Sequence, residues 1–259
     1  MIINEVFCSE ASEFMSGLPA NSINLLLGSP PYDKLREYNG FVFPFETIAQ
    51  QSYRVVADGG VLVWVVGDST VKGSETGSSF KQALYFMSLG FKLHDTMIYA
   101  KMNYIPQTHN RYEQEFEYMF VFVKGKLKTF NPIRVPAITA GDTMKLNRNG
   151  YGFKEGSFRR RNAAITTGET KVPGNIFYYA CGSSGKNHPG VFPAQLAADH
   201  ISTWTNFGDL VFDPFVGSGT TVEEAKKLGR NYLGCDISSE YIEDLKERLP
   251  LIFSTSDIL

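Results

Sequence analysis

The chain has 259 residues, of which 43% are apolar and 14% aromatic. That is enough to build the core of one large domain, with or without an insertion, and it excludes wholesale disorder. The net charge of −2 is distributed unevenly along the chain. Residues 124–186 carry 12 Lys and Arg against 3 Asp and Glu, and the remaining residues carry 13 Lys and Arg against 24 Asp and Glu. Such a basic segment is typical of a protein that binds a polyanion.

The sequence also bears on the cellular location of the protein. No uninterrupted apolar run approaches the roughly 18–20 residues of a membrane span. The first residues, Met1–Glu5, place no positive charge before an apolar stretch, so we expect no secretory signal. Cys8, Cys181 and Cys235 are odd in number and far apart, which favours neither a disulfide framework nor a zinc site. The sequence predicts a reduced, cytoplasmic protein without a membrane segment or a metal.

The first part of the chain alternates between predicted strands and helices. In chain order, the predictions are strand 22–28, helix 43–57, strand 61–66, helix 79–89, strand 95–100 and strand 117–123. The continuous apolar run Val61–Val66 is typical of a strand covered on both faces. This alternation predicts a mostly parallel α/β sheet.

The periodic pattern breaks between about residue 124 and residue 189, where Gly, Pro, Asn and basic residues dominate. Beyond it we predict helix 193–205, strand 210–213, helix 220–228, strand 232–236 and a last helix that Ser238 caps and that ends near residue 249. The two α/β stretches look like two halves of a single sheet domain. We therefore predict three parts: 1–125, a basic insertion at 126–187, and 188–259.

A glycine-rich turn joins the predicted strand 210–213 to the next helix, in the sequence Asp213-Pro214-Phe215-Val216-Gly217-Ser218-Gly219-Thr220. Its glycines allow a ligand to approach the backbone, and the helix start offers free N–H groups. Asp236 ends the following strand, where a carboxylate can accept both hydroxyls of a ribose. An ordinary βα turn and a nicotinamide site are the alternatives, although Val222 does not suit the latter.

A second motif, Ser29-Pro30-Pro31-Tyr32, follows the predicted strand 22–28. Two prolines stiffen this loop and remove two N–H donors, which leaves the Pro30 carbonyl able to accept a hydrogen bond. That carbonyl and the Ser29 hydroxyl suit an exocyclic amine, and Tyr32 could stack on a planar base. A plain Pro-Pro turn is the alternative for this motif taken alone.

Together the two motifs resemble those of the S-adenosylmethionine-dependent, amino-methylating DNA methyltransferases. Ser29–Tyr32 is similar to the family's catalytic [S/D/N]-P-P-[Y/F] motif, and Asp213–Gly219 to its D-P-F-x-G-S-G cofactor motif. The catalytic motif comes first and the basic insertion lies between the two, an order that resembles the permuted β group. The resemblance implies a Rossmann-like, seven-stranded, mostly parallel sheet with helices on both faces and a basic target-recognition insertion.

The resemblance also implies roles for individual residues. Four form the catalytic motif: Ser29, Pro30, Pro31 and Tyr32. Ten are expected to bind the cofactor S-adenosylmethionine: Asp213, Pro214, Phe215, Gly217, Gly219, Thr220, Asp236, Glu10, Asp68 and Phe192. Glu10 stands where the family usually has Asp in a Gly-Asp pair, and Phe116-Glu117-Tyr118 stands where it usually has His-Glu-Tyr.

The implied partner is double-stranded DNA, from which the target base must flip out. Six basic residues of the insertion are expected to contact that DNA: Arg148, Lys154, Arg159, Arg160, Arg161 and Lys171. A solvated charge run is the alternative interpretation. Ser rather than Asp at position 29 favours cytosine N4 over adenine N6 as the methylated amine. As further partners, the resemblance leaves open a second copy of the chain in a homodimer and a cognate restriction endonuclease. The alternative functions are a non-catalytic DNA-binding protein and a nicotinamide-dependent oxidoreductase.

Overall fold

A computed structural model of the chain describes residues 1–31, 43–104, 110–148, 161–166, 168–181 and 193–252. It divides into two compact units, one formed by Met1–Asn131 with Asn175–Leu259 and the other by Pro132–Gly174.

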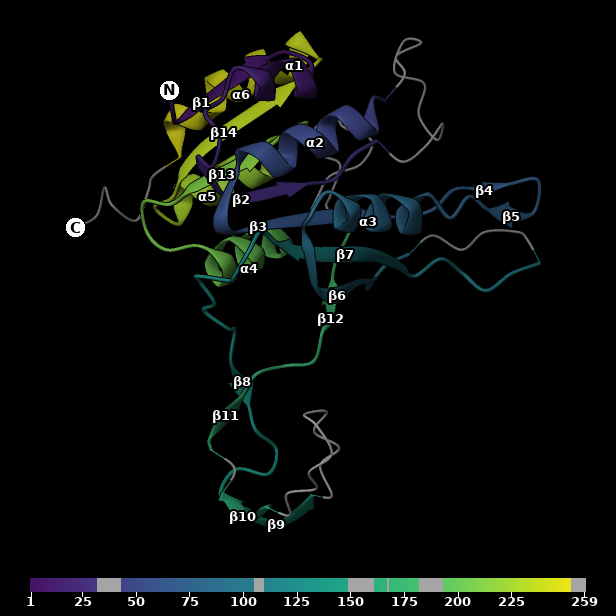
Figure 1. Ribbon diagram of the computed structural model, residues 1–259, viewed down its shortest axis with the longest axis vertical. Helices are drawn as coiled ribbons and strands as arrows, with labels where there is room; N and C mark the ends of the chain where they lie inside the picture. The colour runs from purple at the N-terminus through teal and green to yellow at the C-terminus, as the bar shows by residue number, and fades with distance from the viewer. Residues whose placement is uncertain (32–42, 105–109, 149–160, 167, 182–192, 253–259) are drawn as a thin grey trace. The chain divides into compact units, whose positions relative to one another are not determined.

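Within the described residues, the larger unit is built on a sheet of eight strands, and Figure 1 shows them in spatial order from top to bottom. In that order they are β1 (Glu5–Cys8), β14 (Asn231–Asp236), β13 (Leu210–Asp213), β2 (Ile23–Gly28), β3 (Val56–Val66), β7 (Phe116–Val123), β6 (Lys92–Lys101) and β12 (Ile176–Tyr179). Neighbouring strands are parallel except that β7 is antiparallel to β3 and β6. The predicted mostly parallel α/β sheet is confirmed, and the N-terminal and C-terminal parts of the chain pair with each other in it, β2 with β13 and β1 with β14.

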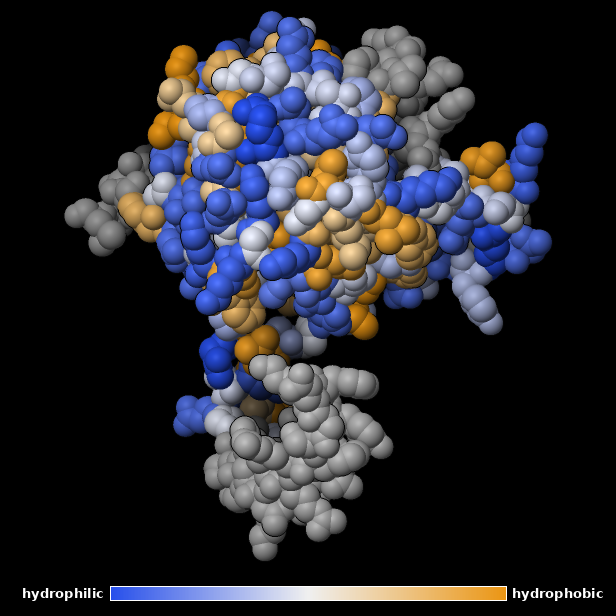
Figure 2. Space-filling view, in the orientation of Figure 1, coloured by the Kyte–Doolittle hydropathy of each residue, from blue (hydrophilic) through white to orange (hydrophobic). Residues whose placement is uncertain are grey.

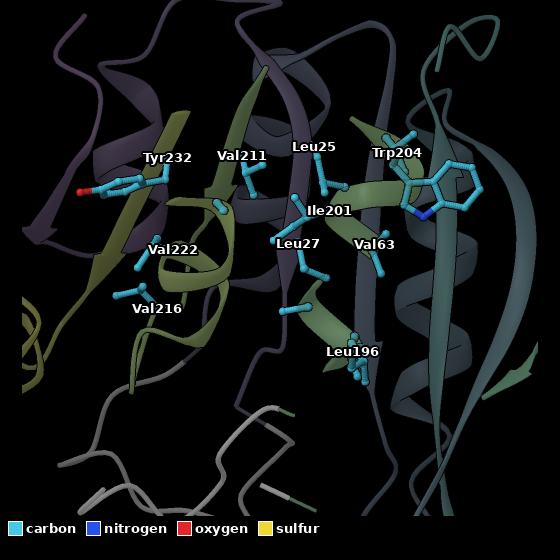
Figure 3. Close-up of a cluster of buried hydrophobic side chains, with 14 of the residues drawn as sticks. Leu25, Leu27, Val63, Leu196, Ile201, Trp204, Val211, Val216, Val222 and Tyr232 are labelled. Carbon is cyan, nitrogen blue, oxygen red and sulfur yellow. The ribbon is translucent and has the colours of Figure 1, made fainter. Parts of the chain in front are cut away.

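Helices cover both faces of this sheet. One face packs against α1 (Ala11–Ser16), α2 (Phe45–Val55) and α3 (Ser78–Ser88), and the other against α4 (Ala194–Trp204), α5 (Thr220–Lys227) and α6 (Ser239–Arg248), which runs into a short 3₁₀ turn, η1 (Leu249–Leu251). Side chains of a strand alternate between faces: Leu25 and Leu27 join the α4–α6 core, and Leu26 joins the α1–α3 core. Figure 3 shows Leu25, Leu27 and their neighbours in the first of these cores.

The central elements follow the sequence prediction closely, whereas peripheral ones differ. Strand β1 and helix α1 were not predicted, because a strand of four residues and a helix of six carry too short a pattern. Strand β12 lies inside the predicted insertion 126–187 but pairs with β6, so it belongs to the sheet. With β12, the sheet has eight strands among the described residues, where the resemblance implies seven, and the smaller unit comprises residues 132–174.

The smaller unit contains two short antiparallel ribbons. Strand β8 (Val135–Pro136) pairs with β11 (Thr170–Lys171), and β9 (Thr143–Arg148) pairs with β10 (Arg161–Thr166). Across the first ribbon, Nε of Arg134 donates to Oγ1 of Thr170 at 2.8 Å. A further hairpin, β4 (Thr70–Val71) with β5 (Ser74–Glu75), belongs to the larger unit.

The outer side of α3 exposes apolar residues. Phe80, Leu84 and Met87 are spaced by four and three positions, so they lie on one helix face, and all three are exposed. Figure 2 shows hydrophobic residues among hydrophilic ones in this region. Across the described ranges, none of the helices is long and apolar enough to cross a membrane.

A fully buried histidine, His200 on α4, lies under the sheet. Its Nδ1 accepts from Nε1 of Trp204 at 3.1 Å, so the proton of a neutral ring sits on Nε2, which is 3.3 Å from Sδ of Met119. Burial lowers the pKa of His200 to about 4. The imidazole is therefore held neutral and acts as a structural acceptor for the indole.

We expect this histidine to make the protein acid-sensitive. Between pH 6.5 and 4 the unfolded chain binds a proton at His200 and the folded chain does not, so the contribution of His200 to stability falls by about 1.4 kcal/mol per pH unit as the pH drops. The raised pKa of Asp213 contributes a slope of opposite sign in this range, so the contribution of His200 is the difference in slope between wild type and His200→Gln, measured by denaturant unfolding from pH 7 to 4. His94→Gln, which changes an exposed histidine whose ring packs against Trp204, should leave the wild-type slope unchanged. Equal slopes in all three proteins would contradict the assignment.

Candidate functional site

Three neighbouring parallel strands, β14, β13 and β2, end at the same edge of the sheet. Their last residues are Asp236, Asp213 and Gly28. In open parallel sheets, ligands bind beyond the carboxyl ends of the strands, where the connections diverge to opposite faces. The loops that follow these three residues therefore form the candidate site.

Gly28, the residue before the predicted catalytic motif, closely approaches the predicted cofactor motif at this edge. A Cβ built on Gly28 would lie 3.1 Å from Cδ of Pro214 and 3.4 Å from Cδ2 of Phe215. Gly28 is followed directly by Ser29 and Pro30, which are half-buried and buried. The start of the Ser29–Tyr32 motif thus lies next to the Asp213–Gly219 turn, and glycine at position 28 permits the close approach. The predicted meeting of Tyr32 with Gly217 lies outside the described residues.

The glycine-rich turn wraps around the end of β13 in a conformation that favours glycine. Gly217 has φ 45° and Gly219 has φ 88°, and Gly219 is the N-cap of α5. A Cβ on Gly219 would collide with the side chain of Leu245 on α6. The turn leaves the start of α5 facing the site, with the N–H groups that such a start offers to an anion.

Asp236, at the end of β14, is hydrogen-bonded to this turn. Its Oδ2 accepts from N–H of Gly217 at 2.9 Å, and its Oδ1 accepts from N–H of Ser238 at 3.0 Å. Each carboxylate oxygen has two lone pairs, so both still have acceptor capacity. The half-buried Asp236 can therefore hold the loop and accept the hydroxyls of a bound ribose together.

Asp213 is buried under the same turn. It accepts from N–H of Phe215 at 2.9 Å. Burial raises the pKa of Asp213 to about 7 with a smaller contribution from the nearby Asp236, while hydrogen bonds from the Thr221 hydroxyl and the Phe215 N–H oppose that rise. A cation bound at this position would favour the ionised form.

Phe215 is half-buried, and its ring is held from one side by other aromatics. It meets Trp64 edge-on at 5.7 Å and Phe43 edge-on at 5.6 Å between ring centroids. Trp64 is in turn fixed by α3, because its Nε1 donates to Oε1 of Gln82 at 2.8 Å. These contacts make Phe215 a rigid part of the site wall.

Two predicted ligands, Glu10 and Asp68, have structural partners. Oε2 of Glu10 caps α1 through N–H of Glu13 at 3.0 Å. Asp68 is buried and accepts from the Ser78 hydroxyl and the Ser79 N–H, both at 3.0 Å, among four donors around the start of α3. These hydrogen bonds lower the pKa of Asp68 against the opposing effect of its burial. Their predicted role as cofactor ligands stays a prediction.

Other predicted residues fall elsewhere. Outside the described residues lie Tyr32, Phe192, Lys154, Arg159 and Arg160. Arg148 and Arg161 are opposite each other on β9 and β10 of the smaller unit. In the same unit, the exposed Lys171 on β11 lies opposite Val135 on β8.

Sequence reasoning missed Arg248, at the end of α6. Its NH2 donates to the carbonyl of Ser218 at 2.9 Å, and its NH1 pairs with Glu223 on α5. The helical spacing to Asp244 was the available signal, and it indicates only a solvated ion pair. Arg248 instead holds the glycine-rich turn at Ser218, the residue after the one that Asp236 holds.

The order of strands and the turn after β13 define a Rossmann-like α/β protein whose site lies at the carboxyl edge of the sheet. Residues 23–247 match the family described as DNA methylase, whose members are N6 and N4 methyltransferases. The chain belongs to this family.

Individual relatives agree with this assignment. The orphan methyltransferase M.BamHII of Bacillus amyloliquefaciens is 48% identical over 235 residues, covering 88% of this chain and 89% of that protein. The DNA adenine methyltransferase YhdJ of Escherichia coli (strain K12) is 27% identical over 238 residues, covering 87% and 76%.

Solved structures share the fold. The PvuII DNA methyltransferase, described as cytosine-N4-specific, has a TM-score of 0.68 at 18% identity and covers 96% of this chain and 93% of its own. A DNA modification methylase from Thermus thermophilus, TTHA0409, solved in complex with S-adenosyl-L-methionine, has a TM-score of 0.63 at 22% identity and covers 95% of each chain.

The packing of α6 on Gly219 can be tested with a matched pair of variants. Gly208→Ala places a Cβ in open space at φ 79° and should cost only the left-handed strain, about 1–2 kcal/mol. Gly219→Ala adds a collision with Leu245 and should cost about 2–5 kcal/mol in total. Urea unfolding of both variants measures the difference, and equal losses would contradict the packing argument.

Proposed function

We propose that the protein transfers a methyl group from S-adenosylmethionine to the exocyclic N4 amine of a cytosine flipped out of duplex DNA. The observation that carries this proposal is the close approach of Gly28, the residue before Ser29, to Pro214, because it supports a position of the amine-binding motif next to the cofactor turn. The family and its relatives support methylation of DNA. The reaction is proposed to occur in the cytoplasm.

The residues at the carboxyl edge fit this cofactor. Asp236 would accept the ribose hydroxyls, the N–H groups at the start of α5 and Thr220 would hold the methionine carboxylate, and Asp213 would pair with the ammonium end. Gly217 and Gly219 provide the open backbone that a bulky ligand needs. Bound S-adenosylmethionine supplies an electrophilic methyl group on a positively charged sulfonium.

Catalysis by this chain consists mainly of positioning. The Pro30 carbonyl and the Ser29 Oγ accept the two N–H groups of the target amine, whose lone pair is otherwise delocalised into the ring. Holding both protons turns that lone pair toward the cofactor side of the loop. The Ser29 hydroxyl is a weak base, so the amine loses its proton after the methyl arrives, and the mechanism needs no covalent intermediate with the enzyme.

The duplex is held by the basic segment. Flipping a base costs a few kcal/mol, which contacts to the phosphates must offset. Arg148 and Arg161 are opposite each other on one ribbon, and Lys171 is exposed on the other. These positions, with the predicted Lys154, Arg159 and Arg160, provide the positive charge for such contacts.

Cytosine N4 is favoured over adenine N6 by Ser rather than Asp at position 29. The fold is shared with a cytosine-N4-specific enzyme, and a sequence relative is named an adenine methyltransferase. Adenine N6 is therefore the alternative, with the same fold, cofactor and positioning chemistry.

Product analysis separates the two amines. The purified protein is incubated with unmethylated bacterial DNA and S-adenosylmethionine, and the digested nucleosides are identified by mass spectrometry. N4-methylcytosine is the expected product. N6-methyladenine would overturn the base assignment alone, and methylation of neither base would overturn the proposed activity.

Two substitutions separate catalysis from cofactor binding. Ser29→Ala removes an acceptor of the amine and should lower kcat at least tenfold with the Kd for S-adenosylmethionine within twofold of wild type. Asp236→Ala removes both the ribose contact and the Gly217 hydrogen bond, so it should weaken that Kd at least tenfold. Single-turnover rates and calorimetric titration measure the two effects. Full turnover in Ser29→Ala would remove Ser29 from the mechanism.

Lys171 tests the DNA-binding role of the insertion. Neutralising one phosphate contact should reduce the salt dependence of binding, log Kd against log[salt], by about 0.9. We expect this reduction for Lys171→Ala in fluorescence anisotropy with a duplex. Lys227→Ala, on α5 of the larger unit, is the control and should leave the slope unchanged. An unchanged slope for Lys171→Ala would exclude a phosphate contact there.

A further inference from the structure

An ion pair between Lys101 and Glu117 lies at the carboxyl edge of the sheet. Nζ of Lys101, the last residue of β6, is 2.8 Å from Oε1 of Glu117, near the start of β7, and the two side chains are only 23% and 16% exposed. The Lys101 N–H also donates to the carbonyl of Glu115 at 2.7 Å. Removing two charges from water is costly, and the pair lies past the last core residues of its strands, Tyr99 and Met119.

Strand register places the pair near the catalytic loop. Gly28 is opposite Trp64, and Trp64 is opposite Phe120. Glu117 therefore lies two strands away from β2 and three residues beyond the level of Gly28, toward the carboxyl edge. At about 3.3 Å per residue and about 4.8 Å between strands, its Cα is roughly 10 Å along and roughly 10 Å across the sheet from that of Gly28. Lys101 lies one strand further, on β6, and its ammonium group reaches Glu117. A base whose amine meets Ser29 and Pro30 would extend from β2 toward this ion pair.

The pair also lies on the appropriate face. Leu27, Tyr99 and Met119 all belong to the core under α4. Because side chains alternate, Glu117 and Lys101, each two residues from a member of that core, point to the same face. The position two residues after Leu27, where the catalytic motif begins, continues this face as well.

We propose that Lys101 binds the ring edge of the target base and that Glu117 is the positioning residue that orients Lys101. This inference rests on the proposed function. When the amine meets Ser29 and Pro30, the remaining groups on the pairing edge are acceptors, namely the ring nitrogen of either base and the carbonyl oxygen of cytosine. An ammonium donates to such acceptors and accepts nothing. Glu117 neutralises the positive charge of the Lys101 ammonium group, so this charge does not draw more electron density away from the target amine.

The variant Lys101→Met tests the contact in the full-length protein. Two duplexes carry the recognition sequence that the wild-type enzyme methylates, one intact and one with an abasic site in place of the target nucleotide. We expect kcat/KM on the intact duplex to fall at least tenfold. The Kd for the abasic duplex and the Kd for S-adenosylmethionine should stay close to those of wild type, because the base is the only part of either ligand that Lys101 contacts. The Tm should fall, because Glu117 loses its ion pair with Lys101, so the rates are measured at a temperature well below the Tm of the variant.

The variant Glu117→Gln tests the positioning role. It should lower kcat/KM as well, and the double variant should be no worse than Lys101→Met alone, since Glu117 acts through Lys101. Lys92→Met, at the amino end of the same strand, is the matched control and should behave as wild type. An unchanged kcat/KM in Lys101→Met, or an equal loss of affinity for the abasic duplex, would overturn the inference.

The two proposals fail in different ways. If the wild-type protein methylates no DNA, the proposed function fails and the inference with it. If wild type methylates DNA and the substitution at Lys101 changes nothing, only the inference fails.

Discussion

The pairing of β13 with β2 is the constraint on which the site depends. In this pairing, Val211 and Phe212 lie beside Leu25 and Leu26, although the two segments are more than 180 residues apart in the chain. Because both strands run parallel and end together, the residues that follow them must meet at one edge. The contact of Gly28 with Pro214 is the direct result. A Cβ at position 28 would lie 3.1 Å from Cδ of Pro214, so a side chain there would crowd the Pro214 ring.

Around this contact, the glycine-rich turn is held from two directions. Asp236 accepts the N–H of Gly217 from the end of β14, and Arg248 donates to the carbonyl of Ser218 from the end of α6. Leu245 packs against Gly219 from the same helix. A loop that must be open to a ligand is thereby kept in one conformation before the ligand binds, which lowers the ordering cost of binding.

Much of this arrangement was predictable from the sequence. The buried run Val61–Val66 and the strand Leu210–Asp213 were predicted because long apolar runs and a Gly turn leave few alternatives. The Ser238 cap was predicted as well, and its hydroxyl accepts from N–H of Tyr241. In contrast, β12 was placed in the insertion, since an edge strand of four residues is stabilised by its neighbour β6 rather than by its own pattern. The roles of Arg248 and Gly28 depend on tertiary contacts: the spacing of Arg248 to Asp244 indicates only an ion pair within α6, and the sequence does not mark Gly28 as a close contact.

The buried acid Asp213 connects the stability of the fold to the chemistry of the site. With its pKa raised to about 7 by burial, this carboxyl group is not fully ionised at neutral pH, and ionising it has a cost in free energy. An ammonium group bound nearby would offset that cost and favour the charged form. Asp213 and the ligand would then stabilise each other, because the folded protein gains the interaction and the unfolded chain does not. A hydrophobic residue at position 213 would remove the cost, but it would also remove this coupling. The position therefore suits a site that binds a cation better than a core optimised for stability alone.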